Sequence, residues 1–224
     1  MQKRRTISQR SELIYDIHNF SVNADTRELF LNPDYNVEND EAEVDHRMAV
    51  TLIKNITFLN SQNDNPIIVH MCSCGGSWEY GLAIYDAIKS SQSEVYIITY
   101  AHASSMSSII LQAGDYRILT NNSYVMVHEG SDWWEGTTKG LITYAQQAKK
   151  ANEQMFDIYL ERCKNGPYFK TNKMSDLRIR NFLKKQMEKK QEWYLSVEEA
   201  VQYGFADYIL GSKNCPSISD ILSV

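Results

Sequence analysis

The sequence predicts an α/β fold with a mostly parallel sheet. Two apolar segments, residues 67–71 and 95–101, have the composition of strands that are buried on both faces. Each is followed by a turn and a helical pattern, over residues 78–89 and 106–112. Strands that alternate with helices favour a parallel sheet whose strands are joined by right-handed crossovers.

The N-terminal part adds an arm, a strand, a loop and a helix. Residues 1–25 are polar and mixed, and we expect a flexible or partner-docked arm there. A short strand at 27–31 and an acidic loop at 32–43 follow. Apolar residues then recur at helical spacing between residues 44 and 59, which predicts an amphipathic helix.

Short strands are predicted at residues 117–120 and 124–128. A long helical pattern then runs over residues 137–164 and ends at Asn165-Gly166-Pro167. Because this helix is long for a small domain, we expect it to project and to pack against another subunit. The two tryptophans before it, Trp133 and Trp134, suit an exposed binding surface and a core position equally well.

The C-terminal part begins with a helix over residues 176–190, rich in Lys and Arg. A solvated face is the preferred explanation of that charge. Ser196 and Glu199 form a capping box that opens a short helix. Gly204 closes this helix, and residues 206–210 form the last strand.

Composition excludes several classes of function. The 224 residues suit one domain with a large core. The net charge of −5 gives no electrostatic case for nucleic-acid binding. No apolar run approaches the roughly 18–20 residues that span a bilayer. No apolar segment follows the basic N-terminus, so it is not a secretory signal.

Cysteine spacing predicts no metal site. Cys72 and Cys74 are separated by one residue, and no second close pair completes a zinc site. We expect thiols in a reducing cytoplasm, and neither a metal nor a cofactor.

Ser105 and His128 are the candidate catalytic pair. Ser105 follows a predicted strand at the start of a helix, and His128 ends a nearby strand, so the two side chains can meet. A serine hydroxyl is a poor nucleophile until a neighbouring base takes its proton. For an isolated pair, the more common explanation is a helix cap and an ordinary strand-end histidine.

Four motifs follow one another along the chain. They are Ser73-Cys74-Gly75-Gly76, Ala103-Ser104-Ser105-Met106, Tyr124-Val125-Met126-Val127-His128, and Trp193-Tyr194-Leu195-Ser196 with Glu199-Ala200 and Tyr203-Gly204. These motifs and their order resemble the Clp protease catalytic subunit (ClpP) family. Together they cover roughly residues 27–210. The resemblance implies a ClpP/crotonase-like spiral of βαβ units with a protruding handle helix, and serine peptidase activity inside a ring.

The resemblance assigns site residues one by one. Ser105 matches the family nucleophile and His128 the general base. The backbone N–H groups of Gly76 and Met106 match the oxyanion hole, and Glu192 stands at the position of the third triad member. The strand that pairs with an extended substrate matches residues 131–136, with Ser131, Asp132, Trp133 and Trp134 as substrate-binding residues.

The chain departs from the family pattern at several positions. Cys74 stands where the family has Pro, and Glu129-Gly130 replace Gln-Pro. Glu192 replaces Asp, and its extra methylene changes the reach of the carboxylate towards His128. Lys189, Lys190 and Gln191 occupy positions where the family carries an acidic–Arg pair tied to ring contacts, and residues 166–175 form an apparent insertion.

The resemblance also implies a division of the chain and a set of partners. Residues 1–26 would be an arm for axial or partner docking, residues 27–210 the peptidase domain with its handle at about 131–165, and residues 211–224 a tail. The expected partners are peptides or unfolded proteins, copies of the chain in heptameric rings, and a Clp-type ATPase unfoldase.

Three other classes compete with this interpretation. A catalytically impaired structural ring subunit would keep the fold without the activity. A crotonase-type acyl-CoA enzyme shares the spiral and a backbone oxyanion hole, but it has no need of a serine turn paired with a histidine. A signal-peptide peptidase with a Ser–Lys dyad is disfavoured by His128 and by the lack of a membrane segment.

Overall fold

The computed structural model describes residues 6–31, 41, 43–130, 133, 135–215 and 217–221. It confirms the α/β class. Within these residues, eight strands form one sheet, with the order β1-β2-β3-β4-β5-β8, and β6 pairs with both β4 and β7. The strands are β1 Val22–Asn23, β2 Glu28–Leu31, β3 Ile67–Ser73, β4 Val95–Ser104, β5 Tyr116–Leu119, β6 Tyr124–Val127, β7 Trp193–Leu195 and β8 Tyr208–Ile209.

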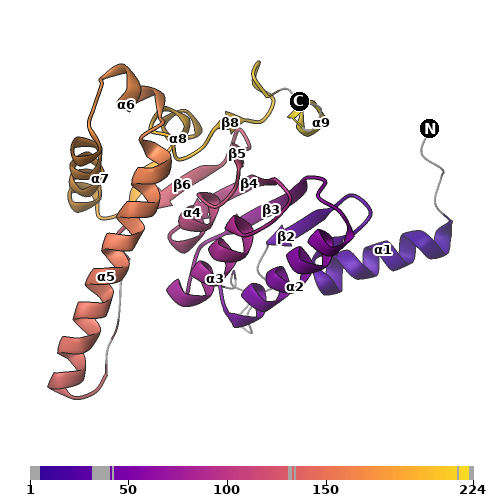
Figure 1. The fold of residues 1–224 in the computed structure, drawn as a ribbon, viewed down its shortest axis with the longest axis horizontal. Coiled ribbons are helices and arrows are strands. Elements are labelled where there is room, and N and C mark those ends of the chain that lie inside the picture. Colours follow the sequence, from indigo (N-terminus) through magenta and orange to yellow (C-terminus); the bar gives the residue numbers. More distant parts are fainter. Residues whose placement is uncertain are drawn as a thin grey trace.

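The sheet is parallel except at β1 and β7. Helices α2, α3 and α4 lie together against one face (Figure 1). The helices are α1 Ile7–Phe20, α2 His46–Gln62, α3 Trp78–Lys89, α4 Met106–Leu111, α5 Thr138–Cys163, α6 Pro167–Thr171, α7 Asp176–Lys190, α8 Val197–Gln202 and α9 Ile218–Ile221.

The central strands are buried on both faces, as their apolar composition predicts. One face joins the large core beneath the helices, with Ile67, Val69 and Ile97 almost fully buried. On the other face Ile68 and Ile98 belong to a smaller cluster, which the C-terminal segment covers through Cys215 and Ile218. The expected tail therefore begins with residues that pack on the sheet.

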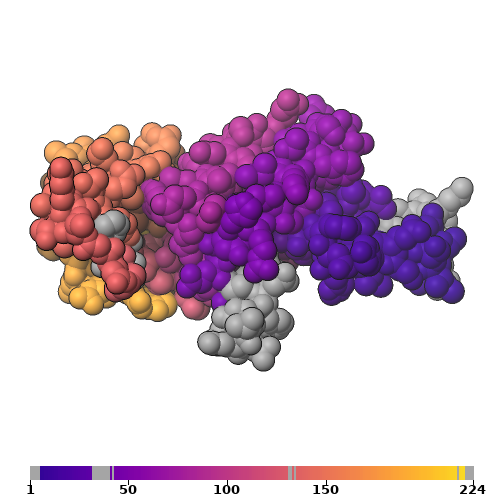
Figure 2. Space-filling model, turned by 90° about the horizontal axis from the view of Figure 1, so that it is seen from below, coloured from indigo at the N-terminus to yellow at the C-terminus, as the bar shows by residue number. Residues whose placement is uncertain are grey.

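The N-terminal arm contains a helix that the sequence analysis did not predict. A capping box between Thr6 and Gln9 starts α1. No residue of α1 is buried, and Ile7, Ile14, Tyr15 and Phe20 are exposed. Helix α1 lies at one end of the molecule, and helices α6 and α7 lie at the other (Figure 1, Figure 2).

The predicted long helix is α5, which extends well beyond the sheet (Figure 1). Its C-terminal half buries Met155, Phe156 and Tyr159, whereas Leu141 and Ile142 in the N-terminal half are 48% and 57% exposed. The protruding half therefore carries apolar side chains that the described residues of the chain leave exposed.

Helix α7 departs in part from the predicted solvated face. Arg180 forms ion pairs with Glu153 and Asp157 of α5, and Lys184 pairs with Glu153. The hydrogen bonds that Lys184 and Arg180 donate to its carboxylate lower the pKa of Glu153 to about 2. The charge on this side of α7 therefore holds the helix against α5, while its apolar side is buried through Ile179, Leu183 and Met187.

The apparent insertion forms α6 and packs into the core. Phe169 is 1% exposed, and a Cβ on Gly166 would lie 2.6 Å from the backbone carbon of Tyr203. The insertion is thus a structural link between α5 and α8.

Candidate active site

Ser105 lies on a sharp turn between β4 and α4. Its backbone has φ 51° and ψ −124°, in the left-handed half of conformational space that residues other than glycine rarely adopt. Its N–H donates to the Met126 carbonyl at 2.9 Å, and its carbonyl accepts from the N–H and Oγ of Ser108 at 3.0 and 2.6 Å. Surrounding structure therefore fixes a strained conformation that directs the side chain away from the helix.

The hydroxyl of Ser105 contacts His128 and does not cap the N-terminus of α4. Ser105 makes no side-chain capping bond, which overturns the helix-cap alternative. Its Oγ lies 2.7 Å from His128 Nε2. The sheet produces this meeting, because β4 and β6 are parallel neighbours with Ser104 opposite Met126, and both side chains follow the ends of those strands.

His128 is poised to act as a base. Burial lowers its pKa, and the Glu192 carboxylate partly offsets this effect by raising it. The imidazole is therefore neutral at pH 7 and can accept a proton at Nε2.

Glu192 lies beside this pair but does not bond to it. It precedes β7, whose Trp193 pairs with Val127 of β6, so the register places Glu192 next to His128. Its Oε2 accepts a hydrogen bond from the Tyr194 hydroxyl at 2.8 Å. Among the described residues, no hydrogen bond or ion pair joins Glu192 to His128, and the carboxylate acts on the imidazole through its charge.

The glycine turn after β3 packs directly against Ser105. Gly75 and Gly76 have φ +98° and +145°. A Cβ on Gly75 would lie 2.7 Å from the Ser104 carbonyl oxygen and 2.8 Å from the Met106 nitrogen. Only glycine lets the two backbone segments come this close. An ordinary tight turn therefore does not explain why two glycines stand at positions 75 and 76.

Two backbone N–H groups remain available at this turn. Within the described part of the chain, neither the Gly76 nor the Met106 N–H has a hydrogen-bond acceptor. The Met106 N–H is one of the orphan donors at the start of α4. The structure thus brings both predicted oxyanion-hole residues into the neighbourhood of Ser105.

The predicted substrate-binding residues are only partly described. Trp133 is 78% exposed, which excludes the core alternative for this residue. Ser131, Asp132 and Trp134 lie outside the described residues.

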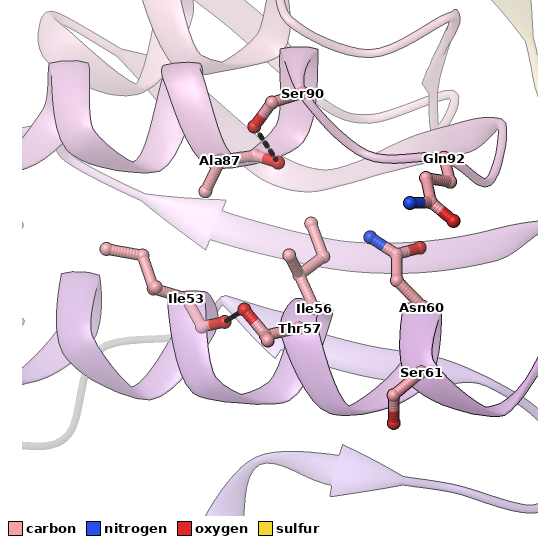
Figure 3. Close-up of a pocket in the computed structure, with 8 residues that line it drawn as sticks. All are labelled: Ile53, Ile56, Thr57, Asn60, Ser61, Ala87, Ser90 and Gln92. Carbon is pink, nitrogen blue, oxygen red and sulfur yellow. Dashed lines mark hydrogen bonds between the residues drawn. The ribbon is translucent and has the colours of Figure 1, made fainter.

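A surface pocket that the sequence analysis did not predict lies between α2 and the end of α3. It has a volume of about 420 Å³, and its lining includes Ile53, Asn60 and Gln92. The amides of Asn60 and Gln92 face each other across it (Figure 3). Its lining comes from elements that do not carry Ser105 or His128, so the pocket is separate from the candidate active site.

The fold and the paired side chains define an α/β protein with a serine–histidine site. The family model described as Clp protease matches residues 39–213. ATP-dependent Clp protease proteolytic subunits of Deinococcus radiodurans and Chlorella vulgaris are each 31% identical over 170 residues, which is 75% of this chain and 76% and 77% of those proteins. The chain belongs to the Clp protease family.

A solved structure shows the same fold. A mutant ClpP1 from Listeria monocytogenes superposes with a TM-score of 0.68 at 20% identity, over 85% of this chain and 95% of that one. The resemblance inferred from the order of motifs is confirmed. Within the described residues, no helix has the length and apolar character needed to cross a membrane.

Proposed function

We propose that this chain hydrolyses peptide bonds as a serine endopeptidase, with Ser105 as the nucleophile and His128 as the general base. The observation that carries the proposal is the 2.7 Å contact between Ser105 Oγ and His128 Nε2. A nucleophile within hydrogen-bond reach of a neutral base is the arrangement that this chemistry requires.

The reaction follows from these positions. Ser105 Oγ attacks the scissile carbonyl carbon while its proton passes to His128 Nε2. The tetrahedral intermediate then collapses, and the imidazolium gives that proton to the leaving amine, which leaves an acyl-enzyme. His128 next takes a proton from water, the water oxygen attacks the acyl carbon, and the proton returns to Ser105 as the acid is released.

Two other groups would stabilise the charges that develop. The N–H groups of Gly76 and Met106 would donate to the oxyanion, and a donor of this kind typically contributes about 3–4 kcal/mol in the transition state. Glu192 would be the third triad member. Its carboxylate raises the pKa of His128, which favours the imidazolium form during catalysis.

Substrates would be peptides and unfolded proteins bound as extended strands near residues 131–136, beside the exposed Trp133. The chain would assemble into heptameric rings, one or two stacked, through the protruding half of α5. A Clp-type ATPase would unfold protein substrates, and the arm at residues 1–26 would dock near the ring entrance. We place this activity in the cytoplasm; no disulfide joins the described cysteines.

A catalytically impaired structural ring subunit is the second candidate. The specific observation in its favour is that Glu192 bonds to Tyr194 and not to His128. If the carboxylate kept that position during turnover, His128 would lack a hydrogen-bonded acid to orient it.

Covalent labelling separates the two candidates. A fluorophosphonate probe should label the wild type, and Ser105→Ala should abolish labelling. The matched control is Ser107→Ala, since Ser107 stands two residues later, in α4, and bonds to Ser73 and not to His128. Labelling that survives Ser105→Ala would refute the assignment of the nucleophile, and an unlabelled wild type would favour the impaired subunit.

A further inference from the structure

Three side chains of the types that bind metal ions meet beside the glycine turn. They are Cys72 at the end of β3, His102 near the end of β4, and Glu41 from the segment before α2. Their donor atoms all lie within 4.8 Å of one another. Strand pairing produces the Cys72–His102 half of the cluster, because Ser73 and Ala103 are partners across β3 and β4.

The imidazole of His102 is held in one orientation. Its Nδ1 lies 3.1 Å from Ser104 Oγ, and its Nε2 lies 3.2 Å from Glu41 Oε2. The ring stacks on Tyr124 with centroids 5.5 Å apart. A hydrogen bond from Nδ1–H to an outer partner is the usual way in which a protein aims the other ring nitrogen at a metal.

The carboxylate of Glu41 is fixed from the other side. Its Oε1 accepts a hydrogen bond from the Cys74 N–H at 2.8 Å, while Oε2 faces His102. The His102 side chain is 16% exposed and that of Glu41 35%. An ion can therefore reach the cluster from solvent.

We propose that Cys72, His102 and Glu41 bind a thiophilic divalent transition-metal ion, with Zn²⁺ as the best match, and that water fills the fourth position. Thiolate, imidazole and carboxylate are the ligands that Zn²⁺ takes in proteins, whereas Mg²⁺ and Ca²⁺ prefer oxygen donors. Zn²⁺ bonds of about 2.0–2.3 Å place tetrahedral donors roughly 3.3–3.8 Å apart. Glu41 Oε2 and His102 Nε2 are already 3.2 Å apart, so closing the cluster to that size requires the Cys72 sulfur to move towards this pair, from within 4.8 Å. Binding releases the Cys72 thiol proton to solvent.

This site would support the catalytic turn without taking part in the reaction. Glu41 holds the Cys74 N–H, one residue before Gly75. Ser104, the partner of His102, precedes Ser105. A bound ion would thus tie together the two strand ends from which the glycine turn and the candidate nucleophile emerge.

The test uses Co²⁺ as a spectroscopic probe of the full-length protein after treatment with a chelator and gel filtration. A thiolate ligand gives a near-ultraviolet charge-transfer band, and tetrahedral Co²⁺ gives strong visible bands. We expect both bands to saturate at about one Co²⁺ per chain, to disappear when Zn²⁺ is added, and to persist in excess Mg²⁺ or Ca²⁺.

Variants identify the ligands. Cys72→Ser should abolish the charge-transfer band, and His102→Gln and Glu41→Gln should weaken binding. Ser104→Ala should lower the affinity by roughly 10-fold to 100-fold, as expected for an outer partner of a ligating histidine. The matched control is Cys74→Ser, which removes a neighbouring thiol but keeps the backbone N–H that Glu41 accepts, and it should retain the band.

A measurement on the wild type covers the case in which a variant does not fold. Zn²⁺ should protect Cys72 from alkylation by iodoacetamide, with the site mapped by peptide mass spectrometry, and Mg²⁺ should not. The inference is overturned if the wild type gives no saturable Co²⁺ spectrum, if Cys72→Ser keeps the band, or if Cys74→Ser loses it equally. It is also overturned if Zn²⁺ leaves the alkylation of Cys72 unchanged.

Discussion

Replacing Gly76 with alanine would test the oxyanion hole and the support behind it together. A Cβ at this position would lie 2.5 Å from the Val44 nitrogen, 2.7 Å from the Val44 oxygen and 2.8 Å from Glu43 Cβ. Two of these atoms are backbone, so no side-chain rotation relieves the overlap. The turn and the Val44 backbone must therefore move apart, which displaces the Gly76 N–H from its present position.

The contacts that Gly76→Ala would break determine how much stability the variant loses. The Val44 N–H donates to the Gly75 carbonyl at 2.7 Å, and the Val44 carbonyl accepts from Ser77 at 2.9 Å. Two lost hydrogen bonds and a strained alanine at φ +145° should lower the free energy of unfolding by about 2–6 kcal/mol. Loss of one oxyanion donor should lower kcat by about 10²–10³-fold.

The assays separate these two effects. Urea denaturation measures the stability, and hydrolysis of a fluorogenic peptide, normalised to the fraction that a fluorophosphonate labels, measures turnover per functional site. The control is Gly211→Ala, where φ is +83° but the nearest atom to the added Cβ, Asn121 Nδ2, is 3.7 Å away. Gly211→Ala should lose about 1–3 kcal/mol from strain alone and should keep its turnover. Wild-type turnover in folded Gly76→Ala would refute the oxyanion role of Gly76.

Three further outcomes are expected. Glu192→Gln should lower turnover and move the acid limb of the pH–rate profile to lower pH, because the Glu192 carboxylate raises the pKa of His128; a limb that stays in place would exclude this coupling. Leu141→Lys with Ile142→Lys should release smaller species in native mass spectrometry, while Leu177→Lys, at an even more exposed apolar site on α7, should not. An unchanged mass would show that the protruding half of α5 takes no part in assembly. Short peptides should be cut without ATP, whereas a folded protein stabilised by about 5–15 kcal/mol should resist until an unfoldase is added; its rapid degradation by the chain alone would contradict the compartment model.

The sequence predicted those elements whose signal is local. The segments around β3 and β4 are apolar runs next to turns, and α3 and α5 have clear helical patterns, so their positions were close to those observed. Helix α1 was missed because it buries no residue, and only its Thr6–Gln9 capping box marks it. Strand β7 was missed because it has three residues and exists through its pairing with β6.

The sequence likewise predicted some features of the candidate site and not others. Ser105 and His128 were predicted as a pair because each follows a strand, and parallel strands bring such residues to the same edge of a sheet. The bond between Glu192 and Tyr194 was not predictable, since it depends on how far a glutamate reaches in the folded protein. Cysteine spacing could not indicate the proposed metal site, because His102 and Glu41, which lie near Cys72, come from distant segments of the chain.

The segment before α2 contacts the turn that contains Gly75 and Gly76, and these contacts fix the backbone of the candidate oxyanion hole. Among the described residues, three hydrogen bonds join this segment to the glycine turn, one through the Glu41 carboxylate and two through the Val44 backbone. At about 0.5–1.5 kcal/mol each, their sum is comparable to the cost of holding strained backbone at an active site, of order 1–3 kcal/mol for each residue. A Gly-Gly sequence alone permits the turn but does not select it. The orientation of the Gly76 N–H is therefore set by tertiary contacts, and a change in residues 41–44 should alter catalysis without touching Ser105 or His128.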